Sequence, residues 1–485
     1  MTRRLPLMAA LCALMTAPAL AQETVFPAEL RAHVVLPALT LIAPPSDAPV
    51  DAWISGKFAA GPNRVDRPMS VEGNTGTLHG GRSTGIRYPF IGQPVQGFSG
   101  FAMDFGPEGS VYALTDNGFG SKVNSPDALL FFHRVIPEFD TGNLDIVETV
   151  FLRDPDHIIP FRIAHEGTEA RYLTGADFDL ESIQVVDGKV WIGEEFGPFL
   201  LSATLDGVIT GLHPTMLNGE ELKSPDHPTL RVPAAAGSDF TVPRSGGFEG
   251  MALHPETGNL WAMLEKPLLD ESGETGPRVL EVMEFDPLLE RWTGETFQFP
   301  LAEGATAIGD FNFIDDTHAL VIERDNGEGD PSLACADPEQ PQADCFPRPA
   351  NLKRVVLIDT STVDANGLVR RVGHVDLMNI NDPHGKARIQ TDAKRDLTGK
   401  FTLPFFTIED VMRYDDNHIL VGTDNNLPFS SGRHLDAAMN NEFVLLYVPE
   451  MLHAELPEEE RTFEEEPEAA PEMDDSEEGE DTSAE

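Results

Sequence analysis

The sequence has few basic residues. Its 485 residues include 34 lysines and arginines against 81 aspartates and glutamates, which gives a formal net charge of −47. Such a chain repels the phosphates of nucleic acids and the headgroups of anionic membranes, so we expect neither as a partner. A negatively charged small molecule would be repelled as well, unless a bound cation reversed the local field.

Cysteine is also scarce, with three residues in the chain. Cys12 lies in an apolar N-terminal segment, whereas Cys335 and Cys345 flank a loop rich in proline and acidic residues. Two neighbouring cysteines in an exported protein typically pair. We therefore predict a Cys335–Cys345 disulfide that staples this loop, rather than a zinc site or a redox centre.

Long apolar runs are missing outside the N-terminus, so we expect no membrane span. Two arginines precede the apolar residues 5–17, and residues 19–21, Ala-Leu-Ala, have the small-x-small pattern of a cleavage site. These features predict a signal peptide over residues 1–21, cleaved before Gln22, and hence a periplasmic or secreted protein.

The C-terminal end has few apolar residues. Between Glu455 and Glu485 there are sixteen acidic residues and one arginine. A segment of this composition cannot bury enough apolar surface to fold. We predict a disordered acidic tail over residues 453–485, which leaves residues 22–452 as one domain.

What the sequence does contain is a recurring hairpin, which is clearest at residues 246–267. Two apolar runs, 251–253 and 260–264, flank a turn of Pro-Glu-Thr-Gly-Asn. A hairpin brings its two open ends together, so Glu249 should lie near Glu265. Two carboxylates at one strand end are costly unless they share a cation or a proton.

The same pattern occurs five times in all, and the other four copies span residues 97–118, 179–198, 309–327 and 408–426. Each copy is followed by a further apolar run, so the repeating unit is an antiparallel sheet of three or four strands.

Such units arranged radially make an all-β fold, the β-propeller, and a β-sandwich is the alternative. We expect six blades, with five or seven as alternatives. Residues 22–96 should supply an additional blade or close the ring against the strand near residues 443–448.

Acidic residues recur at matching places in these hairpins. Carboxylate-rich sites poor in thiol and imidazole suit Ca²⁺, with Mg²⁺ as an alternative. The candidate metal ligands are Asp116, Glu181, Glu195, Glu249, Glu265, Glu323, Asp325, Glu409 and Asp424. The alternative interpretation is that some of these acids cap strand ends or pair with basic side chains.

Familiar nucleophile motifs are missing. Ser99 lies in Gly-Phe-Ser-Gly, but Phe101 stands where a G-x-S-x-G elbow needs glycine. There is no H-E-x-x-H, P-loop or dinucleotide fingerprint.

Three motifs together resemble the phytase-like family, whose members are often labelled "esterase-like activity of phytase". They are D-L-E-S followed by V-W-I-G-E-E-F-G-P, then G-G-F-E-G-M-A-L, then V-I-E-R-D-N-G. The resemblance covers roughly residues 95–447 and departs from the pattern in the first hairpin, where Ser99 replaces an acid. It implies a β-propeller and calcium-dependent hydrolysis of phosphate esters. The candidate metal or catalytic acids that it carries over are Glu181, Glu195, Glu249, Glu265, Glu323 and Asp325.

The leading hypothesis is therefore an exported, monomeric hydrolase of small phosphate esters. Glu195 or Glu249 would be the general base. The candidate phosphate contacts are Arg244, Lys266, Arg324 and Arg433. The alternatives are a carboxylester or lactone hydrolase on a calcium propeller, and a non-catalytic, calcium-stabilised binding propeller.

Overall fold

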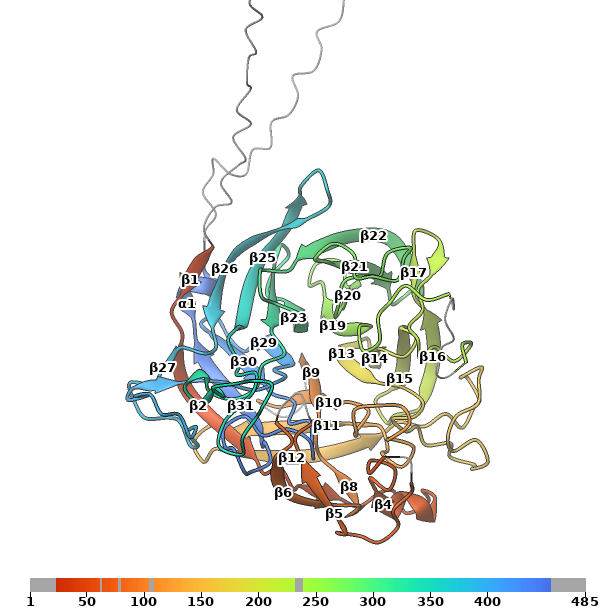
Figure 1. Ribbon diagram of the computed structural model, residues 1–485. Helices are drawn as coiled ribbons and strands as arrows, with labels where there is room; N and C mark the ends of the chain where they lie inside the picture. Colours follow the sequence, from red (N-terminus) through yellow and green to blue (C-terminus); the bar gives the residue numbers. More distant parts are fainter. Residues whose placement is uncertain (1–22, 62, 77–79, 104–108, 232–238, 455–485) are drawn as a thin grey trace, which may run out of the picture. The chain divides into compact units, whose positions relative to one another are not determined.

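The recurring hairpins form the first two strands of five β-sheets. The computed structural model describes residues 23–61, 63–76, 80–103, 109–231 and 239–454. The predicted signal peptide and nearly all of the predicted acidic tail lie outside the described residues. The chain divides into a unit ending at Leu452 and a second one beginning at His453. The five sheets belong to the first unit and are arranged as a β-propeller (Figure 1).

Each of the first three blades is one antiparallel sheet of four consecutive strands. Blade one holds β9 (Phe98–Met103), β10 (Val111–Thr115), β11 (Phe131–Glu138) and β12 (Asn143–Phe151). Blade two holds β13 (Leu180–Val186), β14 (Lys189–Glu194), β15 (Phe199–Thr204) and β16 (Ile209–Pro214). Blade three holds β19 (Phe248–Leu253), β20 (Leu260–Leu264), β21 (Val279–Asp286) and β22 (Arg291–Pro300).

The last two blades each recruit strands from the N-terminus. Blade four holds β23 (Ala307–Phe313), β24 (His318–Arg324), β25 (Lys353–Val363), β26 (Val369–Asp376) and β1 (Thr24–Phe26). Blade five holds β29 (Asp410–Arg413), β30 (His418–Gly422), β31 (Asn441–Tyr447) and β2 (Glu29–Leu36). Two short strands, β27 (Ile380–Asn381) and β28 (Lys400–Phe401), extend the edge of blade five.

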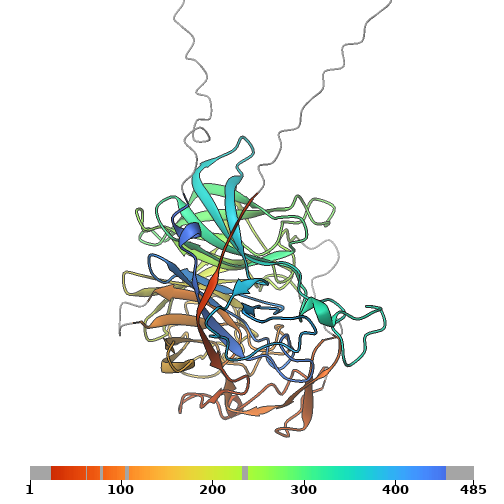
Figure 2. The ribbon, with the colours of Figure 1, turned by 90° about the vertical axis from the view of Figure 1, so that its left-hand side faces the viewer.

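Strand β2 closes the ring, because it pairs with β31 in antiparallel register from Glu29–Tyr447 to Leu36–Asn441. Figure 2 shows the N-terminal segment, in red, lying across the outside of the last two blades. The prediction that residues 22–96 close the ring is therefore confirmed. The expected number of six blades is wrong and five is correct, because the N-terminal strands join existing sheets instead of forming another.

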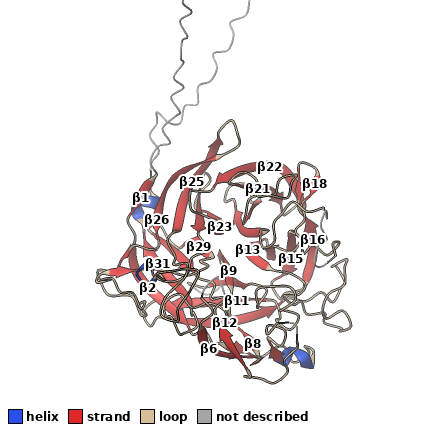
Figure 3. Cartoon of the chain, viewed as in Figure 1, coloured by secondary structure: helices blue, strands red, loops and turns tan. Residues whose placement is uncertain are grey.

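The remaining elements are short and lie in the loops between strands. They are the strand pairs β3 (Leu41–Ile42) with β8 (Gln93–Pro94), β4 (Ile54–Ser55) with β7 (Phe90–Ile91), β5 (Val71–Asn74) with β6 (Ser83–Tyr88), and β17 (Met216–Leu217) with β18 (Glu220–Glu221). Among the described residues, the helical elements are η1 (Val50–Trp53), η3 (Pro331–Leu333) and α1 (Pro449–Leu452), so strands dominate the fold (Figure 3). Within the described ranges, the helices are all too short to span a bilayer.

The core lies between neighbouring blades. One cluster joins blades one and two through Leu114 and Ile183, and another joins blades three and four through Met263 and Val321. A strand between two such layers buries both faces, which explains why the second strand of each hairpin reads as a continuous apolar run.

Buried polar side chains also join the innermost strands β9, β13, β19, β23 and β29, which surround the centre in Figure 1. Gln184 of blade two donates to the Met251 carbonyl of blade three at 2.7 Å, and Asn312 of blade four donates to the Val411 carbonyl of blade five at 2.9 Å. Asp410 of blade five accepts from the Gly100 amide of blade one at 2.8 Å. These bonds hold the strands that carry the candidate site.

The predicted disulfide between Cys335 and Cys345 is confirmed. The Arg82 guanidinium donates to the Cys345 carbonyl at 3.0 Å and lies 4.3 Å from the ring centre of Phe346. The stapled loop, which connects β24 and β25 within blade four, is thereby attached to the β5–β6 hairpin.

Candidate functional site

Two of the candidate acids occupy β-bulges at the start of innermost strands. In β13, Leu180 pairs with Glu194 and Ser182 with Gly193, which leaves Glu181 as the extra residue. Glu249 is the extra residue at the same place in β19. A bulge changes the direction of a side chain, and here it brings equivalent carboxylates of two blades to one end of the propeller.

The ends of the second strands supply a matching set. The amides of Asp116, Glu195 and Glu265 bond to the carbonyls of Gly97, Asp179 and Gly247 at 2.8, 2.9 and 2.8 Å. These bonds extend each hairpin by one residue pair, so the three acids occupy equivalent places. In blade four the equivalent residue is Arg324, whose carbonyl accepts from the Thr306 amide at 2.8 Å.

Together these positions form what we call the central acidic cluster. It consists of Asp116, Asp179, Glu181, Glu195, Glu249, Glu265, Glu409 and Asp424. Seven of the eight are buried, none of those seven more than 8% exposed, and Asp116 is half-buried. Two subsets have ligand oxygens within 4.8 Å of one another, and both contain Glu195: Asp179 with Glu181, and Glu249 with Glu265.

The cluster is strained electrostatically. Burial, together with repulsion from neighbouring carboxylates, raises the pKa values of Asp116, Glu181, Glu195 and Glu249 well above their ordinary values. Burial and the nearby Asp424 charge raise the pKa of Glu409 to about 8. Burial raises the pKa of Asp424 itself to about 6. At neutral pH the cluster must therefore hold protons or a cation.

Two oxygens of the cluster are available as ligands for a cation. Asp179 Oδ1 and Glu249 Oε1 are buried and have no hydrogen-bond partner. The donors are all carboxylate oxygens, which suit Ca²⁺ or Mg²⁺ better than softer metals. Acidic residues placed in this way could bind a divalent cation, and each of the two groups that contain Glu195 brings three ligand oxygens together.

Two of the four predicted phosphate contacts touch the cluster. One terminal nitrogen of Arg324, Nη2, lies 2.8 Å from Glu265, 3.5 Å from Glu409 and 3.8 Å from Glu249. Lys266 forms an ion pair with Glu265 and donates to the Ser245 carbonyl. The positive charges of Arg324 and Lys266 thus lie beside the carboxylates of blades three and five.

A third cation, Arg244, is half exposed and precedes Ser245, whose carbonyl accepts from Lys266. Its guanidinium forms an ion pair with Asp226. Lys122 donates to the Asp226 carbonyl at 3.1 Å, and its Nζ lies 5.1 Å from the ring centre of Phe196, the residue after Glu195. Sequence reasoning missed Lys122, because it lies in a blade-one loop without a repeated pattern.

Three other candidates are engaged elsewhere in the described structure. Glu323 pairs with Arg371 through two contacts of 3.0 and 2.9 Å. Asp325 pairs with Lys353 at 3.0 Å. Since neighbours on a strand point to opposite faces, Glu323 and Arg324 cannot both turn toward the cluster.

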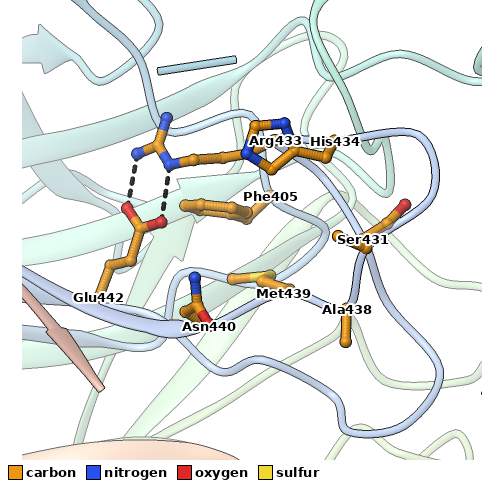
Figure 4. A pocket seen from close by; sticks show the side chains of 9 residues that line it. Phe405, Ser431, Arg433, His434, Ala438, Met439, Asn440 and Glu442 are labelled. Atoms are coloured by element: carbon orange, nitrogen blue, oxygen red, sulfur yellow. Dashed lines mark hydrogen bonds and ion pairs between the residues drawn. The ribbon is translucent and has the colours of Figure 1, made fainter. Parts of the chain in front are cut away.

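Arg433 is the third of these. It donates to Glu442 through two bonds of 2.7 and 2.6 Å, and Figure 4 shows this pair. The cavity beside it measures about 10 Å³, which is room for one water molecule. Arg433 therefore stabilises blade five through Glu442 and is not one of the basic groups that contact the cluster.

One ligand candidate, Asp179, is absent from the predicted set. The hairpins around Gly97 and Gly247 have glycine at the equivalent position, so no repeated acid marks it. The feature of the sequence that could have identified Asp179 is its position two residues before Glu181. Ser99 is fully buried and donates to Glu409 at 3.2 Å, so it supports a carboxylate of the cluster.

Comparison with solved structures returned several distant likenesses. A Bacillus subtilis arabinanase is 11% identical with a TM-score of 0.32, covering 73% of this chain and 94% of that one. A β-1,3-galactosidase of family GH43 is 10% identical with a TM-score of 0.36, covering 78% and 94%. The calcium-binding protein regucalcin from Agrobacterium tumefaciens is 10% identical with a TM-score of 0.30, covering 73% and 92%. Scores this low carry no argument about activity or ligands.

A search of curated proteins found no match. The scan against protein families matched residues 93–427 to the family described as "Phytase-like: Esterase-like activity of phytase". This match spans blades one to three, blade four except β1, and β27 to β30 of blade five, and it includes all eight carboxylates of the central acidic cluster. The chain belongs to the phytase-like family.

Proposed function

We propose that this protein is an exported, calcium-dependent hydrolase of phosphate esters whose site is the central acidic cluster. The observation that carries the proposal is the concentration of buried carboxylates, whose basic partners among the described residues are Arg324 and Lys266. Membership of the phytase-like family supports ester hydrolysis. The disulfide supports an oxidising compartment and hence export.

The residues divide between holding the cation and acting on the substrate. Asp179, Glu181 and Glu195 would hold Ca²⁺, with Mg²⁺ as the alternative ion. The bound ion would supply positive charge that polarises the ester and offsets repulsion of an anionic substrate. Glu249 would be the general base, because its Oε1 has no hydrogen-bond partner and its carboxylate lies in one group with Glu195 and Glu265.

Basic side chains on one side of the cluster would bind the phosphate. Lys266 is anchored by Glu265 and Ser245, and Arg244 is anchored by Asp226. Lys122 lies beside the same Asp226. These groups would offset the charge of an anionic substrate, and Glu249 would activate the water that attacks its ester bond.

The test uses purified protein that begins at Gln22, assayed with and without Ca²⁺ against phytate, an aryl phosphate and an aryl carboxylic ester. We expect phosphate release that requires calcium. Glu249→Gln should lower turnover by about 10²–10⁴-fold while calcium binding is retained, as expected for loss of a general base. Glu195→Gln should weaken both calcium binding and turnover.

The control is Glu148→Gln, which makes the same chemical change at a side chain that is 52% exposed on the outer strand of blade one. It should leave turnover unchanged. Hydrolysis of the carboxylic ester alone would favour a carboxylester or lactone hydrolase. Calcium binding without any turnover would favour a binding propeller, and turnover unaffected by chelation would refute the proposal.

A further inference from the structure

Blade four departs from the pattern of the other blades at both positions that face the cluster. After the second strand it has Arg324, where the other blades have an acid. At the bulge it has Gly309, because Ile308 pairs with Glu323 and Asp310 with Ile322. A Cβ at Gly309 would lie 2.0 Å from the Ile408 carbonyl oxygen, so no side chain fits there.

Arg324 brings a permanent positive charge to the cluster from blade four. It is 5% exposed, and its Nη2 is the nitrogen that contacts Glu265, Glu409 and Glu249. Its Nη1 donates to Asn326 at 3.1 Å, which fixes the guanidinium plane. Since arginine is protonated at every relevant pH, it balances charge in this half of the cluster permanently.

The other half of the cluster has no such partner. Within the described ranges, Asp179, Glu181 and Glu195 form no ion pair with a lysine or an arginine, whereas Glu265 has two. Asp179 Oδ1 is also one of the buried oxygens without a hydrogen-bond partner. Asp116 and Asp424 form no ion pair in these ranges either, but they belong to neither group of three close ligand oxygens. The group of three that lacks a basic partner is therefore the one on the blade-two side.

We propose that Arg324 acts as a built-in cation that stands in for a metal ion among Glu249, Glu265 and Glu409, and so confines added calcium to the group of Asp179, Glu181 and Glu195. This inference rests on the proposed calcium dependence. It makes Arg324 a positioning residue that sets how many ions the cluster holds and where. Its guanidinium is engaged by carboxylates and does not serve as a phosphate contact.

The test counts tightly bound ions by isothermal titration of chelator-treated protein with Ca²⁺. The unmodified protein should bind one ion and Arg324→Gln two, because the variant frees three carboxylates. Arg324→Lys keeps the charge and should bind one. Arg153→Gln removes the same charge at an exposed pair with Asp206, and should also bind one.

A second pair of variants leaves Arg324 in place, in case Arg324→Gln does not fold. Glu195→Gln should weaken calcium binding by at least about tenfold, because it removes a charged ligand. Glu265→Gln should leave one ion bound with similar affinity.

Two tight ions in the unmodified protein, one ion in folded Arg324→Gln, or equal losses in Glu195→Gln and Glu265→Gln would each overturn the inference while leaving calcium dependence intact. Failure of the unmodified protein to bind any ion would refute both proposals.

Discussion

Glu194 and Glu195 are adjacent glutamates with different roles in the structure. Glu194 accepts hydrogen bonds from the amides of Phe196, Gly197 and Phe199 at 2.7, 2.6 and 2.8 Å, so it shapes the turn after β14. Glu195 accepts one bond, from the Gly247 amide at 3.1 Å, and otherwise faces acids. The first residue is part of the scaffold, and the second belongs to the proposed cation site.

Substituting each by glutamine should separate these duties. Glu194→Gln turns an amide group toward backbone donors and should lower the free energy of unfolding by about 1–3 kcal/mol, with or without calcium. Glu195→Gln should raise it in chelator, because one repelling charge is lost, and should reduce the stabilisation that calcium gives. Urea unfolding in EDTA and in calcium measures both effects. Equal destabilisation by the two substitutions would contradict this assignment.

At the scale of the elements, the hairpins could be predicted from the sequence because each one is local. Apolar runs and turn residues a few positions apart determine them. The cluster was only partly predictable, because its contacts join residues from different blades. Arg324 meets Glu249 and Glu409, which are 75 and 85 residues away. The sequence also did not reveal that the Glu323 side chain points away from the cluster, since its direction depends on the register set by the bulge at Gly309.

Ring closure was predictable only in outline, because β2 and β31 lie at opposite ends of the domain. A buried network fixes their pairing: His33 bonds to Glu442 at 2.8 Å, and Arg433 forms two bonds to the same carboxylate. The Arg433 and His33 charges lower the pKa of Glu442 to about 2, against the opposing effect of burial. Glu442 therefore stays charged and holds both strands.

Glu442→Gln should weaken the pairing of β2 with β31, because Arg433 would be left buried without a counter-charge. We expect a loss of about 3–5 kcal/mol in the free energy of unfolding, the range found when one partner of a buried pair is removed. Hydrogen exchange should also speed up at β2 and β31 more than in blade two. Glu148→Gln, at an exposed pair, should change stability by less than about 1 kcal/mol. A similarly small effect of Glu442→Gln would show that the network does not secure the ring.

At the scale of the whole molecule, two groups of acids give stability opposite dependences on pH. Glu442 and Glu23 have pKa values lowered to about 2, so their contribution is present above about pH 4 and is lost as the pH falls. Asp424 and Glu409 have pKa values raised to about 6 and 8, from ordinary values of 3.8 and 4.5. Their protonated forms fit the fold, so their contribution is complete below about pH 4 and is lost as the pH rises through 6 and 8.

Between pH 5 and pH 8 the cluster titrates together with four buried acids outside it, because burial also raises the pKa values of Asp177, Glu194, Asp310 and Glu328 to about 6, 8, 8 and 7. The change that calcium makes in this interval is therefore what reports on the central acidic cluster. In EDTA we expect the melting temperature to fall across this interval, because the folded cluster must give up protons and accept repulsion. Calcium should remove most of the fall, since an ion that binds only the folded state adds about 2.7 kcal/mol at a hundredfold excess over its Kd. Calorimetric scans at unit pH steps, with and without calcium, measure the two curves. Parallel curves would mean that calcium does not relieve the cluster. A melting temperature that rises with pH in EDTA would mean that the buried carboxylates are already balanced without an ion.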